Sequence, residues 1–152
     1  MRVLVDTNVL IRSVEPNDPD HKTADDAVAA LRAQGHELCL VPQNLYEFWV
    51  VSTRPAAQNG RGKTPDEMAA EFSFLKTHFT VLPDTPAVFP EWETLVTTYK
   101  VIGKPSHDAR LVAAMLAHGV THILTFNDSD FRRYAGITPL PPAAIVASAG
   151  VP

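Results

Sequence analysis

Acidic side chains occupy four places in this sequence where a purely structural protein gains little from a charge. They are Asp6, Glu47, Asp108 and the neighbouring pair Asp128 and Asp130. If the fold gathers such carboxylates at one place, they repel one another unless a cation lies between them. Oxygen ligands without cysteine select a hard ion, so the sequence predicts Mg²⁺ or Mn²⁺. An ion held this way beside an open cleft suits phosphodiester hydrolysis, because it positions the scissile phosphate and activates water.

Each of these acids also has a simpler explanation. Asp6 could cap a helix that follows it, and Glu47 could form a buried ion pair with a lysine or arginine. Asp108 could interact favourably with the dipole of its own helix. Asp128 and Asp130 could serve only a turn, because turns favour Asn and Asp.

The elements that must position the acids alternate between strands and helices. Short apolar runs predict strands over residues 3–5, 37–41, 79–82 and 122–125, with a last possible strand near 144–146. Apolar residues at helical spacing predict helices over 20–34, 43–53, 86–100 and 106–118, and a further helix that begins after Thr64. This alternation predicts an α/β fold with a parallel sheet that is covered by helices on both faces.

The predicted elements bring the acids toward one edge of the sheet. Asp6 follows the first strand, and the acids after residue 125 follow the fourth, so both stand at carboxyl ends of strands, where ligands bind. The helix over 43–53 is apolar almost all round, which predicts a central position and a carboxylate, Glu47, that needs a partner. Asp108 shares the core-facing side of its helix with Leu111 and Val112.

Composition sets the limits of the fold and of the function. The chain has 152 residues, with 13 Lys and Arg against 17 Asp and Glu, a formal charge of −4. We expect one domain over residues 1–152, with a variable loop at about 54–64 and a proline-rich tail at 138–152. A single cysteine, Cys39, excludes an internal disulfide and a cysteine zinc site. Neither a membrane span nor a signal peptide is predicted, which makes a cytoplasmic protein the expectation.

Four segments in order resemble the PIN-domain family and, within it, the VapC-type toxin ribonucleases of toxin–antitoxin pairs. They are Val3–Leu10, Glu47, His107–Ala114, and Thr125–Asn127 with Asp130 and Phe131. The resemblance runs from residue 1 to about residue 134, and its specificity lies in the combination of the segments. It implies a three-layer α/β/α sandwich around a central, mainly parallel sheet.

The resemblance also implies roles for individual residues. Asp6, Glu47 and Asp108 correspond to metal-binding acids, and Asp130 corresponds to the fourth, with Asp128 as the alternative. Side chains that orient the carboxylates or lie near the metal would be Thr7, Asn8, Thr125 and Asn127. The implied protein is a Mg²⁺- or Mn²⁺-dependent endoribonuclease toxin of a type II pair. It would be inhibited by a cognate VapB-type antitoxin and would form a homodimer.

A protein of charge −4 needs local cations to bind RNA, because its bulk charge does not attract a polyanion. The candidates are Arg54, Arg61 and Lys63 in the glycine-bearing loop, and Arg110 close to Asp108. Glycines in that loop would let the backbone approach phosphates.

Two other functions stay open at this level. A PIN-like module could bind RNA or a protein partner without cleaving, although all the acid positions are occupied. A phosphoacceptor or phosphohydrolase could use Asp6 as nucleophile, but that chemistry usually needs an acid two residues later, where Asn8 stands. No phosphate-binding glycine loop follows the first strand either.

Overall fold

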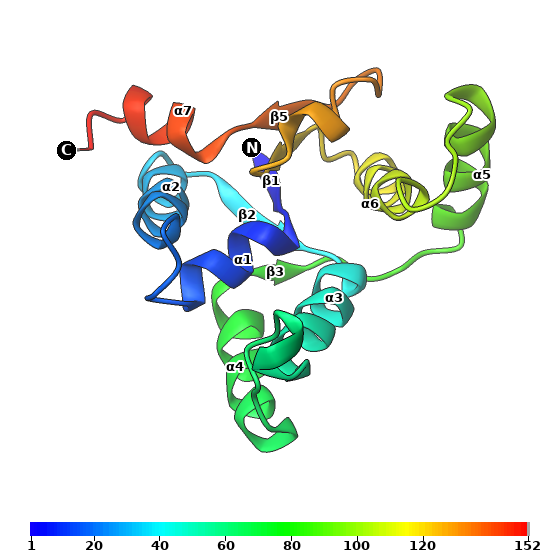
Figure 1. Cartoon of the computed structure of the whole chain (residues 1–152). Coiled ribbons are helices and arrows are strands. Elements are labelled where there is room, and N and C mark those ends of the chain that lie inside the picture. The colour runs from blue at the N-terminus through cyan, green and yellow to red at the C-terminus, as the bar shows by residue number, and fades with distance from the viewer. Residues whose placement is uncertain (152) are drawn as a thin grey trace.

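The computed structural model describes residues 1–151. Its strands are β1 (Arg2–Val5), β2 (Glu37–Leu40), β3 (Thr80–Val81), β4 (His122–Leu124) and β5 (Thr138–Leu140). Its α-helices are α1 (Thr7–Val14), α2 (His21–Ala33), α3 (Pro42–Thr53), α4 (Pro65–His78), α5 (Val88–Thr98), α6 (Ser106–Ala117) and α7 (Pro142–Ser148). All strand pairs are parallel, and the sheet has the order β3-β2-β1-β4-β5 (Figure 1). The predicted α/β fold with a parallel sheet is confirmed.

β1 is the middle strand, and its side chains are buried on both faces of the sheet. Leu4 belongs to one apolar cluster, while Val3 and Val5 belong to a second cluster on the opposite face. This alternation follows from the two-residue period of a strand. Leu4 aligns with Cys39 of β2 on one side and with Ile123 of β4 on the other. Cys39 is a buried free thiol, as the apolar run around it indicates.

Helices cover both faces of the sheet and complete the two cores. α5 and α6 pack on the face that carries Leu4. α1, α2, α3 and α4 contribute to the opposite core, where α7 packs against α2 (Figure 1). The result is a three-layer α/β/α arrangement in which β1 and β4 end side by side.

α3 does not lie in the centre of the protein, so the prediction from its all-round apolar character is wrong. Phe48 on its inner side is fully buried, but Tyr46 and Val50 are 62% and 53% exposed. Trp49 is also exposed and makes an edge contact with the ring of Phe72 on α4. The outer apolar residues of α3 therefore cover a surface instead of filling a core.

The C-terminal region differs from its prediction. The strand expected near residues 144–146 is part of α7, because Pro142 stands at the first helical position and favours a helix start. A strand that was not predicted, β5, lies just before it and contains Pro139. β5 is an edge strand, where a proline is tolerated because one side of the strand needs no donor.

The loop at residues 54–64 closes on itself. The amides of Gly60 and Gly62 donate to the carbonyls of Pro55 and Arg54. A Cβ atom on Gly60 would lie 1.8 Å from the Arg54 carbonyl oxygen, so only glycine fits there. Here the glycine permits close approach within the loop's own backbone.

Candidate active site

Asp6 lies at the carboxyl end of β1 and is only 7% exposed. Its Oδ2 accepts hydrogen bonds from the Thr125 hydroxyl at 2.7 Å and from Asn8 Nδ2 at 3.1 Å. Asp6 occupies the residue before α1, a helix that was not predicted as an element. Its side chain makes no capping hydrogen bond, so the helix-cap explanation does not account for this acid.

Polar side chains tie the end of β4 to the start of α1 around Asp6. The Thr125 hydroxyl accepts from the Asn127 amide at 3.0 Å, and Asn8 Oδ1 accepts from the Phe126 amide at 3.3 Å. Thr7 accepts from Asn44 of α3 at 3.3 Å. The residues expected to orient carboxylates thus surround Asp6, and for Asn127 it is the backbone that takes part.

Glu47 is half-buried on α3 and faces the same region. Its Oε1 accepts a hydrogen bond from Gln43 Nε2 at 2.7 Å. Within residues 1–151 no lysine or arginine forms an ion pair with Glu47, so the buried-ion-pair explanation does not apply. Gln43 was not among the predicted site residues, although its spacing of four residues from Glu47 places both on one helix face.

Asp108 lies in the first turn of α6 and is half-buried. Burial raises its pKa, and the negative charges of Asp130 and Glu47 raise it further. Asp128 instead forms an ion pair with Arg132 on the surface. Of the two candidates for the fourth acid, Asp130 is therefore the one whose charge acts on Asp108.

One cleft of about 360 Å³ collects three of the predicted acids. Its lining residues are Asp6, Thr7, Asn8, Ile11, Arg12, Asp18, Glu47, Val51, Asp108 and Asn127. The acids come from different elements: Asp6 follows β1, Glu47 lies on α3 after β2, and Asp108 lies on α6 before β4. These elements are brought together because β1 pairs with both β2 and β4. Asp128 and Asp130 are not among the lining residues.

The cleft stabilises the protonated form of Asp6. Burial raises the pKa of Asp6 to about 6, and the charges of Glu47 and Asp108 add to this effect. The hydrogen bond from the Thr125 hydroxyl and the nearby backbone amide of Thr7 act in the opposite direction. A buried carboxylate among like charges is unstable unless a proton or a cation neutralises it.

Asp6→Asn is expected to stabilise the protein above about pH 6 in EDTA. The pKa of Asp6 is higher in the folded protein than in the unfolded chain. The free energy of unfolding of the wild type therefore falls as the pH rises from about 4 to about 6, and it stays at that lower value at higher pH. The variant lacks this loss, so its free energy of unfolding should be higher by about 1–3 kcal/mol at about pH 8 and similar at about pH 4. Urea unfolding at both pH values measures the difference.

A matched control for this experiment is Asp25→Asn, an exposed acid on α2. Its effect on stability should be small at both pH values. A destabilised Asp6→Asn protein at about pH 8 would contradict the electrostatic description of the cleft.

The donor chemistry of the cleft fits a hard divalent cation. Asp6, Glu47 and Asp108 supply carboxylate oxygens, and none of them forms an ion pair within residues 1–151. Within residues 1–151, no group of three His, Cys, Asp or Glu side chains is close enough together in this structure to hold a metal ion. The acids therefore line an open cleft and do not form a closed cage.

The cations proposed for RNA binding fall into two groups. Arg61 is 7% exposed at its side chain and pairs with Glu71 at 2.7 Å and Glu15 at 3.2 Å, so its guanidinium is engaged inside the protein. This position does not favour Arg61 as an RNA contact. Arg54 and Lys63 are half-buried in the same loop and form no ion pair within the described residues.

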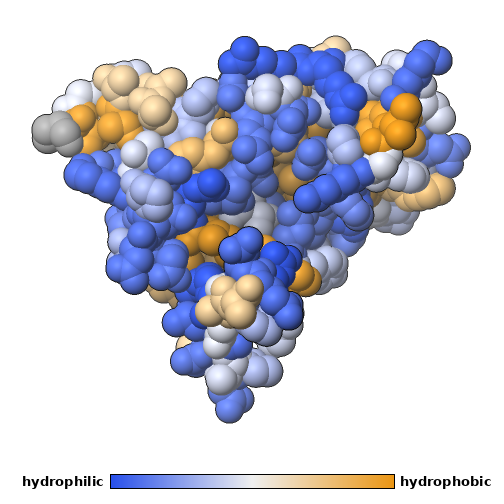
Figure 2. Space-filling model, in the orientation of Figure 1, coloured by the Kyte–Doolittle hydropathy of each residue, from blue (hydrophilic) through white to orange (hydrophobic). Residues whose placement is uncertain are grey.

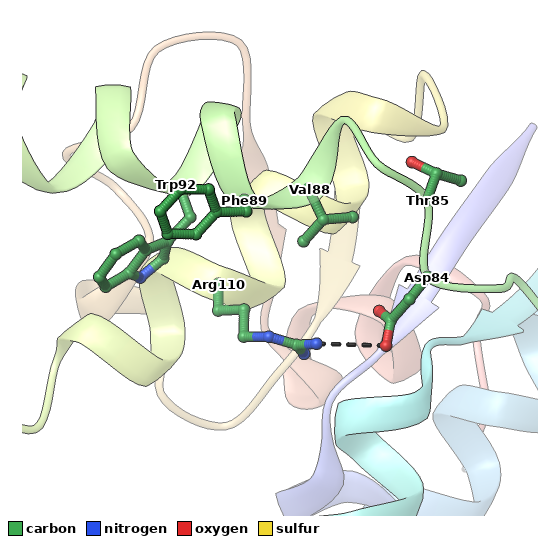
Figure 3. Close-up of a pocket in the computed structure, with 6 residues that line it drawn as sticks. All are labelled: Asp84, Thr85, Val88, Phe89, Trp92 and Arg110. Atoms are coloured by element: carbon green, nitrogen blue, oxygen red, sulfur yellow. Dashed lines mark hydrogen bonds and ion pairs between the residues drawn. The ribbon is translucent and has the colours of Figure 1, made fainter.

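Arg110 is partly exposed at 35% and points toward Asp84, to which Nη2 donates at 3.2 Å (Figure 3). It lines a second cavity, of about 370 Å³, beside Phe89 and Trp92 of α5 (Figure 3). Trp92 is fixed there because its indole NH donates to the Ser106 carbonyl.

Arg12, which was not among the predicted site residues, is the one basic side chain among the described residues that line the acid cleft. It lies 3.4 Å from Asp20 and 3.9 Å from Asp18, and its guanidinium stands over the ring of Phe126 at 4.5 Å. The signal for Arg12 was its spacing of four residues from Asn8, which has meaning only once α1 is known to be helical.

The fold and the site define a class: a parallel α/β protein with carboxylates gathered at the carboxyl edge of the sheet. The sequence pattern of the PIN domain family matches residues 3–137, most of the chain. The chain belongs to the PIN domain family. No curated protein sequence matches it.

Solved structures of similar fold come from toxin–antitoxin systems. VapBC2 from Rickettsia felis, bound to promoter DNA, gives a TM-score of 0.66 at 12% identity over 92% of this chain and 98% of that one. VapBC-1 from nontypeable Haemophilus influenzae gives a TM-score of 0.68 at 15% sequence identity, and the match covers 93% of this chain and 98% of that one. A third structure is VapC20 from Mycobacterium tuberculosis, described as a toxin that cleaves the sarcin–ricin loop. It gives a TM-score of 0.61 at 22% sequence identity, and the match covers 90% of this chain and 99% of that one. These likenesses support the same fold.

Across residues 1–151, no helix has both the length and the apolar character needed to cross a bilayer.

Proposed function

We propose that this protein is a Mg²⁺- or Mn²⁺-dependent endoribonuclease toxin of a type II toxin–antitoxin pair. The observation that carries the proposal is the cleft lined by Asp6, Glu47 and Asp108, because none of these three acids forms an ion pair within residues 1–151. Such a site is electrostatically incomplete without a cation. Membership of the PIN domain family and the likeness to VapC20 support the choice of RNA.

In this proposal Asp6, Glu47 and Asp108 hold the cation, with Asp130 as a further acid beside Asp108. The bound ion supplies Lewis acidity toward the scissile phosphodiester. Thr125 and Asn8 keep the Asp6 carboxylate oriented through their hydrogen bonds. The products carry a 3′-hydroxyl and a 5′-phosphate.

RNA binding is assigned to four basic side chains, Arg12, Arg54, Lys63 and Arg110. Arg12 lines the acid cleft, Arg110 lines the second cavity, and Arg54 and Lys63 would contact phosphates from the loop. Because these cations are few, RNA binding should weaken only moderately as salt rises, since the salt dependence scales with the number of phosphates that are neutralised.

A VapB-type antitoxin is the proposed protein partner. The exposed apolar residues on α3, Tyr46, Trp49 and Val50, surround Glu47 in the sequence and offer a surface for an apolar segment. Figure 2 shows a largely hydrophilic face with separate hydrophobic areas, one of them near α1 and α3. A basic side chain of the antitoxin would neutralise the acidic cleft. We also propose a homodimer that acts in the cytoplasm.

The proposal is tested by incubating purified, antitoxin-free protein with total cellular RNA in Mg²⁺, in Mn²⁺ and in EDTA. Discrete fragments are expected only with a divalent ion, and sequencing of the new ends identifies the RNA. Asp6→Ala should abolish cleavage and remain folded. Cleavage by that variant, or cleavage in EDTA, would overturn the assignment.

An absence of cleavage by folded wild-type protein in both metals would favour a PIN-like module that binds without cutting. Filter binding of the same RNA separates that function from inactivity, because a binding module retains RNA in EDTA.

A further inference from the structure

Gln43 occupies a position in which a buried amide contacts both sides of the acidic cleft. It lies in the first turn of α3, where it is 6% exposed. Its Nε2 donates to Glu47 Oε1 at 2.7 Å and to the carbonyl oxygen of His107 at 2.8 Å. His107 directly precedes Asp108, so one amide nitrogen links an acid of α3 to the turn that carries an acid of α6.

The orientation of this amide is set by its partners. Both groups near the nitrogen are acceptors, and the group near Oε1 is a donor, Arg110 Nη1 at 3.0 Å. Rotating the amide would place its oxygen against two acceptors, which is unfavourable. Arg110 is held in turn by Asp84 (Figure 3). A chain of hydrogen bonds therefore runs from the second cavity through Gln43 to Glu47.

A neutral donor suits this place better than a charged one. Glu47 lies among acids, and a second carboxylate beside it would add repulsion. A lysine would form an ion pair with Glu47 and compete with a cation for the carboxylate. A glutamine amide fixes the carboxylate in direction and leaves its charge unchanged.

We infer that Gln43 is a positioning residue, which holds the Glu47 carboxylate and the first turn of α6 in the arrangement that binds a divalent cation. The inference rests on the proposed function, because it gives Gln43 a role in building the site. Groups that orient metal-binding side chains typically change metal affinity by about 10- to 100-fold when they are lost. Gln43 acts through Glu47 and not on the RNA itself.

The test is direct titration of Mn²⁺ into wild type, Gln43→Met and Gln43→Glu by calorimetry, with thermal melts of each. Gln43→Met retains the length of the side chain without its hydrogen bonds, and it should weaken Mn²⁺ binding by about tenfold or more. Gln43→Glu keeps the size and an acceptor for Arg110 but has no N–H to donate to Glu47 or to the His107 carbonyl, so it too should bind Mn²⁺ more weakly than the wild type. The matched control is Gln58→Met, at an exposed glutamine in the loop, which should bind Mn²⁺ as the wild type does.

A second variant distinguishes positioning from general packing. In a Glu47→Gln background, Gln43→Met should change Mn²⁺ affinity by less than about twofold, because the group through which it acts is already altered. A packing role would lower the melting temperature in both backgrounds and leave the affinity of the folded protein unchanged. If folded Gln43→Met and Gln43→Glu bind Mn²⁺ with the affinity of the wild type, the role of Gln43 is overturned and the proposed function stands. If the wild-type protein itself binds no Mn²⁺, both the role of Gln43 and the proposed function are overturned.

Discussion

Replacing Asp108 with Asn is expected to lower RNA cleavage by about three orders of magnitude while the protein remains folded. The loss corresponds to about 4 kcal/mol of transition-state stabilisation, the size expected when a metal-binding acid is removed from a phosphodiesterase site. The fold should tolerate the change because burial and the charges of Asp130 and Glu47 already raise the pKa of Asp108, so a neutral side chain relieves repulsion. Single-turnover cleavage of a defined RNA, with melting in EDTA, measures both effects.

The control for this experiment comes from the acidic turn that follows β4. Asp128 pairs with Arg132 on the surface, so Asp128→Asn should retain cleavage within about twofold. Asp130→Asn should lose about tenfold or more, because the charge of Asp130 acts on Asp108. If the effects of these two variants were reversed, Asp128 would be the fourth acid.

Thr125→Val is expected to destabilise the protein by about 2–3 kcal/mol at about pH 8, a large effect for the loss of one oxygen atom. The Thr125 hydroxyl is fully buried, donates to Asp6 Oδ2 at 2.7 Å and accepts from the Asn127 amide at 3.0 Å. Valine has the same shape but leaves both groups without this partner. Urea unfolding in EDTA gives the difference.

The destabilisation by Thr125→Val should depend on pH in a defined direction. The Thr125 hydrogen bond favours ionised Asp6, so its loss raises the pKa of Asp6 beyond about 6. The cost is therefore largest above that pKa and smaller at about pH 4, where folded Asp6 is protonated in both proteins. Thr97→Val, at an exposed hydroxyl on α5, is the control, and an equal loss at both pH values would contradict the link to Asp6.

The sheet and the main acids could be predicted because their signals are local. Short apolar runs marked four of the strands, and Asp6 follows β1 directly, so its place at the carboxyl edge needed no tertiary information. Glu47 and Asp108 were recognisable from helical spacing within their own segments. These features depend on neighbours a few residues away.

The supporting contacts were not predictable because their partners are distant in the sequence. Gln43 bonds to the carbonyl of His107 and to Arg110, separations of 64 and 67 residues. Arg61 seemed available for RNA in a glycine-bearing loop, but its ion pairs join the loop to Glu15, just after α1, and to Glu71 on α4. Periodicity assigns a face to a residue, not the group that it meets there.

α1 and α7 show a different limit of sequence reasoning. α1 has eight residues and begins with Thr7 and Asn8, which also favour turns, so its helical pattern was too short to recognise. In α7 the β-branched pair Ile145 and Val146 favoured a strand, but Pro142 starts a helix and both side chains pack on the core beside α2. Tertiary packing decided the outcome in that segment.

The order of the strands has a consequence for synthesis of the chain. β1 is made first but lies in the middle of the sheet, and its neighbour β4 follows more than a hundred residues later. Asp6 receives its hydrogen bond from Thr125 only after β4 has been synthesised and has paired with β1. Because proteins fold N-terminal parts first during translation, a nascent chain carries Asp6 and Glu47 long before it can assemble the cleft. The acid cleft can therefore assemble only when synthesis of the chain is nearly complete.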